Sequence, residues 1–250
     1  MDSVKDLMPQ KHYENLLELE DKYWWHQGKF YAISEFLRPY IKNNSIRLAD
    51  VGCGTGGFLN YAKRELKLNN IIGLDCSQAA LDAIKGRGLT GWSVDFDKDF
   101  FSKDGGYDII TVLDVLEHID DEKNFLKNIH DNLLPDGIIA INVPAFAFLF
   151  SSWDKIHGHK RRYSSGQLKN ILEENNFKVL KISYIFSYLF PVACLRRILR
   201  LNYTDQNCVF PKVSDWVNKA LLRISELETR LAKVIKIPFG SSVLCVARKI

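Results

Sequence analysis

The stretch that most restricts the fold is "LADVGCGTGGFL" at residues 48–59, where an acid and four glycines follow an apolar run. Glycine tolerates positive φ and lets another molecule approach the backbone closely. A turn of this kind between a strand and a helix points the first N–H groups of the helix above the strand end. The stretch therefore predicts a ligand-binding strand–turn–helix unit in preference to a plain tight turn.

The rest of the chain alternates between apolar runs and amphipathic segments. Strands are predicted at 46–52, 70–75, 90–95, 107–114, 137–144, 177–186 and 241–249, and helices near 56–67, 77–87, 121–133 and 165–175. Apolar strands alternating with helices indicate a doubly wound, mostly parallel α/β sheet whose two faces are covered. The sequence predicts three parts: an N-terminal helical cap (1–44, helical over roughly 10–42), a core (45–186 plus 239–250) and a helical insertion (187–238).

Composition excludes several classes of protein. The 250 residues carry a net charge of only +4, which does not indicate a nucleic-acid binder. The cysteines are scattered singly, so neither a zinc site nor a disulfide framework is expected; they are Cys53, Cys76, Cys194, Cys208 and Cys245. The charged N-terminus has no signal-peptide core, so we expect a cytoplasmic protein.

Acids at the strand ends indicate what the glycine turn binds. Gly52, Gly54 and Gly57 satisfy G-x-G-x-x-G, but Asp50 would repel the pyrophosphate of a dinucleotide and instead suits a ligand with positive charge. Asp75 ends the second strand, where an acid can accept hydrogen bonds from ribose hydroxyls or cap the next helix. Asp95-Phe96 follows the third strand and could meet an adenine.

Five stretches taken in order carry a family resemblance: "DVGCGTGGFL", "GLDCSQAAL", "VDF", "YDIITVLDVLEHIDD" and "LLPDGIIAINVPA". They resemble the motifs of class I S-adenosylmethionine-dependent methyltransferases over roughly residues 45–186 and the final strand. The resemblance implies a Rossmann-like seven-stranded sheet with an antiparallel last strand and S-adenosylmethionine as the cofactor. It also implies these cofactor-binding positions: Asp50, Gly52, Cys53, Gly54, Gly56, Asp75, Cys76, Asp95, Phe96, Leu113, Asp114 and Val115.

Two stretches offer candidates for a catalytic base. His118 follows the fourth strand, whose end faces the transferred methyl group in this family, although "LEHI" can equally shape the cofactor pocket. The stretch "WDKIHGHKRRYSSGQL" (153–168) contributes His157, His159 and Tyr163, and its basic residues could hold a carboxylate or phosphate of the acceptor. The alternative for this second stretch is a solvated basic loop.

A metal site is a minority hypothesis. Asp114, Glu117 and His118 stand at i, i+3 and i+4, so on a helix they would share one face. Their spacing is similar to the metal-binding stretch of some O-methyltransferases of the ubiquinone pathway, where a divalent cation could lower the pKa of an acceptor hydroxyl. The main expectation is that no metal is bound.

Two segments outside the core, one before it and one inserted near its end, are candidates for packing against the core or covering the acceptor. Trp24 and Trp25 in "YWWHQGKF" are expected to pack a helix onto the core or to form a lid, and Lys29 stands where some relatives have arginine. In the insertion, "FSYLFPVACL" is too short to span a bilayer and predicts a buried helix, a lid or interfacial contact. An amphipathic helix is expected at 213–235, with a stripe that packs on the core, covers the pocket or forms a dimer contact; its members are Val217, Leu221, Ile224, Leu227 and Leu231.

These observations predict an enzyme that transfers a methyl group from S-adenosylmethionine to an oxygen or nitrogen of a small or lipid-linked acceptor with a hydrophobic part. The alternatives are an NAD-dependent oxidoreductase, which Asp50 does not favour, and a non-catalytic cofactor-binding module. Methylation of RNA has thin support from "HKRRY" alone. Peripheral membrane contact through the insertion is possible, and the sequence does not fix the oligomeric state.

Overall fold

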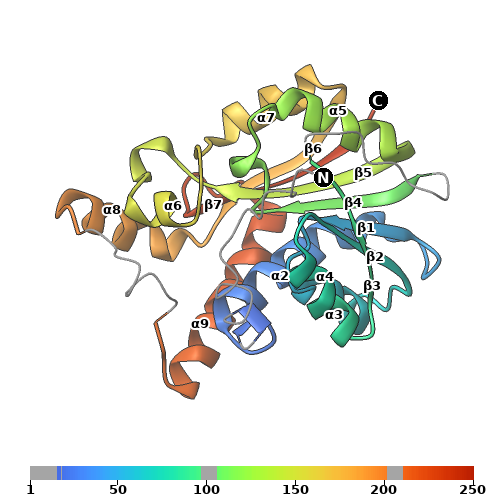
Figure 1. Ribbon diagram of the computed structural model, residues 1–250. Coiled ribbons are helices and arrows are strands. Elements are labelled where there is room, and N and C mark those ends of the chain that lie inside the picture. The colour runs from blue at the N-terminus through green and yellow to red at the C-terminus, as the bar shows by residue number, and fades with distance from the viewer. Residues whose placement is uncertain (1–15, 18, 97–105, 202–210) are drawn as a thin grey trace.

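A seven-stranded sheet forms the centre of the computed structural model, which describes residues 16, 17, 19–96, 106–201 and 211–250 (Figure 1). The strand order is β3-β2-β1-β4-β5-β7-β6. β1 to β5 pair in parallel, whereas β7 is antiparallel to both β5 and β6, which confirms the predicted fold. The strands are β1 (Arg47–Val51), β2 (Asn70–Asp75), β3 (Thr90–Ser93), β4 (Tyr107–Leu113), β5 (Leu133–Pro144), β6 (Phe177–Ile185) and β7 (Ser242–Lys249).

Helices cover both faces of the sheet, as its continuous apolar strands require. Figure 1 shows α5 and α7 on one face, and α2, α3, α4 and α9 on the other. The helices are α2 (Trp24–Leu37), α3 (Gly57–Glu65), α4 (Gln78–Gly86), α5 (Glu122–Asn132), α6 (Ser152–Ile156), α7 (Ser165–Glu174), α8 (Phe190–Ile198) and α9 (Asp215–Val234). Short 3-10 turns lie at η1 (Arg38–Tyr40), η2 (Leu116–His118), η3 (Ala147–Leu149) and η4 (Ser187–Leu189).

Three predicted boundaries were wrong. The fifth strand begins at Leu133 instead of 137, because Leu133 already pairs with Tyr107 before a register shift in β4. The third strand ends at Ser93 instead of 95. The N-terminal helical region is interrupted by a turn at residues 20–22 before α2 begins, and the part of it at 10–15 lies outside the described residues.

The insertion packs onto the N-terminal part of the chain through small residues. The buried side chains of α9 are Ser225, Thr229 and Ala232, and a Cβ on Gly28 of α2 would lie 2.7 Å from Ser225 Oγ. The two helices therefore cross closely, and Leu221 of the predicted hydrophobic stripe packs against the core. Ile224, Leu227 and Leu231 of that stripe are exposed, so these members do not pack on the core.

None of the helices in the described part of the chain combines the length and the hydropathy that crossing a membrane requires. The segment "FSYLFPVACL" covers residues 186–195. In the structure this segment forms η4 and most of α8, and no residue of α8 is buried.

Candidate active site

A cavity of 770 Å³ opens above the carboxyl ends of the central parallel strands. Ligands bind there in doubly wound sheets, because the loops that leave neighbouring strands diverge and leave a crevice. One half of the cavity is lined by the glycine turn and strand-end acids, and the other by histidines and residues of α8. The sequence-predicted residues in its lining are Asp50, Gly52, Cys53, Gly54, Asp75, Phe96, Leu113, Asp114, Val115, Glu117, His118, His157 and His159.

The glycine turn folds as the sequence predicts. Gly52 has a φ of +69°, and a Cβ there would lie 2.3 Å from Val115 Cγ2, so no larger residue fits without a shift. Gly54 also has positive φ, but its missing Cβ leaves open space. Because Gly54 lines the cavity, the turn presents bare backbone to whatever occupies it.

Asp75 organises this turn as well as facing the cavity. Its Oδ2 accepts a hydrogen bond from the backbone N of Gly54 at 2.9 Å, and its Oδ1 accepts one from the backbone N of Ser77 at 2.9 Å. The carboxylate thus bonds the residue just before α4, and it also lines the cavity, as ligand binding requires. Capping of the next helix and binding of a ligand are therefore compatible roles for Asp75, as the sequence suggested.

Asp50 is a buried acid at the end of β1. Burial raises its pKa to about 7, although a hydrogen bond from Thr111 at 2.6 Å opposes this rise. The nearby acids Asp75 and Glu20 raise the pKa further. A positively charged ligand in this half of the cavity would relieve that repulsion and favour the ionised form.

The N-terminal segment closes over the glycine turn through Glu20. The Glu20 carboxylate accepts hydrogen bonds from Thr55 Oγ1 at 2.5 Å and from Arg87 at 3.2 Å. A Cβ on Gly57 would lie 2.4 Å from Glu20 Oε2, so only glycine allows this approach. Burial raises the pKa of Glu20 to about 7, while the bond from Thr55 opposes the rise. Glu20 therefore adds another acid to the cofactor half of the cavity.

Asp114 is bound by a lysine and an amide. Lys29 Nζ lies 2.5 Å from Asp114 Oδ2, and Asn142 Nδ2 donates to Asp114 Oδ1 at 2.6 Å. Lys29 also lies over the ring of Trp25, 4.1 Å from its centroid. Lys29 thus fixes α2 against the end of β4.

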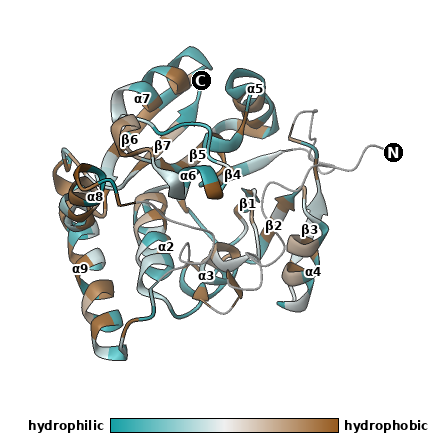
Figure 2. Ribbon diagram, turned by 60° about the vertical axis from the view of Figure 1, so that its left-hand side comes forward, coloured by the Kyte–Doolittle hydropathy of each residue, from teal (hydrophilic) through white to brown (hydrophobic). Residues whose placement is uncertain are grey.

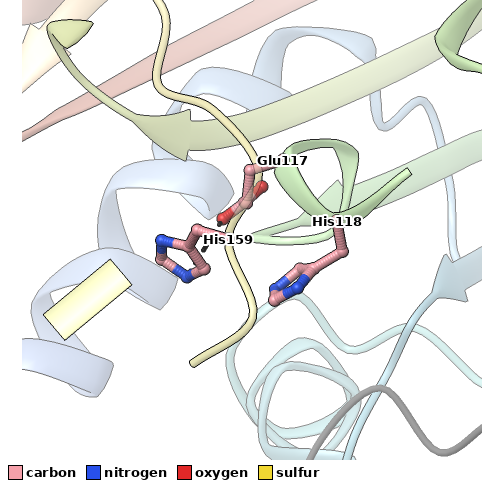
Figure 3. A group of neighbouring side chains, drawn as sticks. All are labelled: Glu117, His118 and His159. Carbon is pink, nitrogen blue, oxygen red and sulfur yellow. Dashed lines mark ion pairs between the residues drawn. The ribbon is translucent and has the colours of Figure 1, made fainter. Parts of the chain in front are cut away.

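The metal hypothesis needs a correction. Asp114 has a φ of +56° and η2 begins only at Leu116, so Asp114, Glu117 and His118 do not share a helical face. The three side chains that come together are Glu117, His118 and His159, whose possible ligand atoms lie within 4.8 Å of one another (Figure 3). This trio could hold a divalent cation, since carboxylate and imidazole suit transition metals.

Burial disfavours the charged forms of both Glu117 and His118. Glu117 is fully buried, and neither of its carboxyl oxygens has a hydrogen-bond partner among the described residues. Burial raises the pKa of Glu117 well above its ordinary value, and the charge of Asp114 adds to this. Burial also lowers the pKa of His118 to about 4, while its contact with the Gly158 carbonyl opposes the shift.

His159 is oriented by a buried acid that the sequence analysis did not single out. Asp154 Oδ1 accepts from His159 Nδ1 at 2.8 Å and from Arg162 Nε at 2.7 Å. Burial alone would raise the pKa of Asp154, but these hydrogen bonds outweigh it and lower the pKa to about 2. Because Nδ1 donates to Asp154, the neutral imidazole leaves Nε2 as an acceptor, 4.0 Å from Glu117 Oε1.

The two remaining catalytic candidates, His157 and Tyr163, bond to other parts of the protein. His157 donates from Nδ1 to the Trp153 carbonyl at 2.9 Å and stacks on the Trp153 ring. Tyr163 lies outside the described cavity lining: its hydroxyl donates to Glu122 at 2.5 Å, and burial and this bond raise its pKa. We therefore assign Tyr163 a structural role in place of the predicted catalytic one. Also outside that lining are Gly56, Cys76 and Asp95.

Three functional residues were missed or undervalued. Asp154 stands in the quoted stretch, five residues before His159, and its position three residues after Ser151 in a capping box was the available signal. Lys29 was noted only for its position in "YWWHQGKF" and Glu20 had no signal, because they reach Asp114 and Thr55 only through the tertiary fold.

The cofactor half fits S-adenosylmethionine by its donor set. Carboxylates at Asp50 and Asp75 suit the cationic and hydroxyl groups of this molecule, and the open space at Gly54 admits it against the backbone. Phe96 is buried and lines the same half, where a ring can contact an adenine. Three acids with no lysine or arginine in the glycine turn suit a diphosphate poorly.

Comparisons with known proteins agree with this geometry. The malonyl-[acyl-carrier protein] O-methyltransferase of Bacillus anthracis is 24% identical over 211 residues, covering 78% of each chain. A ubiquinone biosynthesis O-methyltransferase of Marinobacter nauticus is 33% identical over 116 residues, covering 42% of this chain and 48% of that enzyme. Among solved structures, the [4+2]-cyclase SpnF is similar in fold with a TM-score of 0.62 at 20% identity, covering 96% of this chain and 92% of SpnF.

A family described as "Methyltransferase domain" matches residues 24–182. That range includes α2, the glycine turn, the strand-end acids and the histidine cluster. Since it spans well over half of the chain, the protein belongs to this methyltransferase family and uses S-adenosylmethionine as its cofactor.

Proposed function

We propose that this protein transfers the methyl group of S-adenosylmethionine to an oxygen or nitrogen of an acceptor that has a hydrophobic part, with His159 as the general base. One observation carries the proposal: a single cavity joins the strand-end acids of the cofactor half to a half lined by His118, His157 and His159. When bound, the cofactor supplies an activated sulfonium methyl, so the protein's task is to position and deprotonate the acceptor.

His159 is better placed for proton removal than His118, the first candidate from sequence. Its Nδ1 is fixed on Asp154, which leaves Nε2 free to accept the proton of an acceptor hydroxyl. The ionised Asp154 then stabilises the positive imidazole that results. His118, with its pKa lowered to about 4, stays neutral and serves to shape and orient the site.

The insertion supports an acceptor with both an apolar part and an anionic group. From α8 and the residues that follow it, apolar Val192 and Leu201 line the cavity together with three arginines. A lipid-linked molecule with a carboxylate or phosphate would satisfy both kinds of side chain. The arginines are Arg196, Arg197 and Arg200.

The test is a transfer assay with S-adenosylmethionine labelled in its methyl group and a panel of acceptors. The panel pairs phenols, carboxylic acids and amines with and without a long alkyl chain. We expect labelled product from the alkylated members, with a phenol as the best acceptor class. Binding of the cofactor without transfer to any class would favour the non-catalytic module, and preferential binding of NAD would favour the oxidoreductase.

Asp75→Ala is the matched test of the cofactor half. We expect cofactor affinity to fall, because each charge-assisted hydrogen bond of this carboxylate contributes about 1.5–3 kcal/mol. Asp82→Ala, an exposed acid on the neighbouring α4, is the control and should bind normally. Unchanged affinity in Asp75→Ala would mean that the ribose assignment is wrong.

A further inference from the structure

The insertion leaves an unusually apolar surface uncovered. Eleven of the fifteen large hydrophobic side chains that are exposed in the described part of the chain lie within residues 187–238. Trp216 is 74% exposed and Val234 is 85% exposed. We define the outer face of the insertion as the exposed apolar residues Leu195, Ile198 and Leu199 of the α8 region and Trp216, Ile224, Leu227, Leu231 and Val234 of α9.

On α9 this face is a continuous stripe. The spacing from Ile224 to Leu227, Leu231 and Val234 alternates between three and four residues, which places these side chains on one side of a helix. The opposite side, with Ser225 and Thr229, packs against α2. The stripe is therefore available to a partner along the C-terminal half of the helix, and Trp216 is exposed near its start.

The charge around this face is positive. Residues 187–238 hold nine Lys and Arg against four Asp and Glu, a net charge of +5, whereas the whole chain carries only +4. Lys219 and Arg223 flank the stripe of α9 on one side, one turn apart, and both are exposed, although Arg223 also forms an ion pair with Glu226 at 2.7 Å. Long basic side chains beside apolar ones can bury their stems while their charges reach anionic groups.

These features favour a lipid surface over a second copy of the chain. A two-fold contact through the α9 stripe would bring the same patch of each copy together, so the basic flank of an antiparallel pair would face itself. An anionic bilayer instead matches both the apolar stripe and its basic flank, and tryptophan is enriched at membrane interfaces. Charge complementarity therefore favours an anionic bilayer over a second copy as the partner of this face.

The outer face also adjoins the cavity. Arg196, Arg197 and Leu201 from the α8 region line the cavity, while Leu195, Ile198 and Leu199 of the same region face outward. Figure 2 shows α8 and α9 along the same edge of the molecule, away from β3 and α4. A protein resting on this edge would hold α8 between the bilayer and the acceptor half of the cavity.

We propose that the outer face of the insertion docks the protein on anionic lipid bilayers, so that an acceptor with a hydrophobic tail enters the cavity from the membrane past α8. This inference rests on the proposed function for the identity of the acceptor. The docking itself depends only on the exposed stripe and its positive charge.

Flotation of the full chain with vesicles tests the docking without any acceptor. We expect the protein to float with vesicles of phosphatidylcholine containing about a third phosphatidylglycerol, to stay behind with phosphatidylcholine alone, and to release at high salt. Leu227→Glu/Leu231→Glu and Lys219→Glu/Arg223→Glu should each reduce partitioning at least about tenfold. Ile250→Glu and Lys63→Glu/Lys85→Glu, which change exposed residues elsewhere, should float as the wild type does.

Several results would overturn the proposal. Failure of the wild type to float with anionic vesicles is one, and undiminished flotation of Leu227→Glu/Leu231→Glu is another. If light scattering shows a wild-type dimer that this double variant makes monomeric, the outer face belongs to a second copy. Titration with S-adenosylmethionine on each variant confirms folding, and it separates the two hypotheses: a wild type that floats but binds no cofactor would contradict only the proposed function.

Discussion

His159, which lines the cavity, donates a hydrogen bond from Nδ1 to the buried carboxylate of Asp154 at 2.8 Å, and its opposite ring nitrogen lies 4.0 Å from the carboxyl of Glu117. Asp154 is held in turn by Arg162 and by the backbone of Ser151, so all its contacts favour the ionised form. A base oriented by a fixed acid is the arrangement that general-base catalysis requires. It is built from one short segment, α6 and the loop that follows.

Replacing His159 with asparagine should lower kcat about 10²–10⁴-fold, because proton removal from the acceptor is lost. Binding of S-adenosylmethionine, measured by titration, should stay normal. The loss should be much smaller for a phenol acidic enough to be ionised at the assay pH, since it needs no base. An equal loss for acidic and ordinary phenols would show that His159 has only a structural role; His130→Asn, outside the described cavity lining, is the control.

Cofactor binding should release protons near neutral pH. In the free protein the pKa of Asp50 is about 7, raised by burial, so below that pH the group is mostly protonated. A cationic ligand favours the ionised form, so affinity should rise with pH between about 6 and about 8 and then level off. Titration calorimetry in two buffers of different ionisation enthalpy measures the release, and Asp50→Asn should diminish it; equal proton release in that variant would contradict the assignment.

Gly57→Ala should loosen the N-terminal segment over the cofactor. The new Cβ would lie 2.4 Å from Glu20 Oε2, so the carboxylate must move away from Thr55. We expect the dissociation rate of S-adenosylmethionine to rise about tenfold, which corresponds to the loss of roughly one charge-assisted hydrogen bond. Stopped-flow fluorescence measures this rate. Gly86→Ala, where a Cβ has open space, is the control, and an unchanged rate in Gly57→Ala would mean that Glu20 does not retain the cofactor.

Chelation should leave turnover intact, because His159 acts through a nitrogen that a metal ion would occupy. The measurement is methyl transfer before and after dialysis against a strong chelator, followed by addition of manganese or zinc. If activity disappears and a metal restores it, Glu117, His118 and His159 form a metal site, and the assignment of His159 as the base is wrong.

The sequence predicts the cofactor half of the cavity well because its signals are local. A strand end, an acid and a positive-φ glycine follow one another along the chain, as at Asp50 and Gly52. Acids and glycines at the carboxyl end of a parallel strand have few roles other than ligand binding. Because β1 and β2 are parallel neighbours, Asp75 at the end of β2 lies at the same edge of the sheet as Asp50. The seven strands are predictable because their signal, a short apolar run, is also local in the sequence.

The acceptor half depends on contacts between distant segments, which periodicity cannot reveal. Lys29 reaches Asp114 across 85 residues, and Glu117 meets His159 only because two loops converge. The i, i+3, i+4 spacing from Asp114 was misleading, since the positive φ of this residue breaks the helix that the argument assumed. Helix α9 is amphipathic as predicted, but Gly28 allows its small residues to face α2, which leaves Ile224, Leu227 and Leu231 of the predicted stripe exposed.

The most direct test of the whole account is a crystal structure with S-adenosylhomocysteine, the demethylated cofactor. The account predicts that the ribose hydroxyls bind Asp75, that the amino-acid part lies by Asp50 and the glycine turn, and that the sulfur faces the part of the cavity lined by His118 and His159. A sulfur directed away from these histidines, or a ligand that leaves Asp75 and Asp50 without contact, would contradict it.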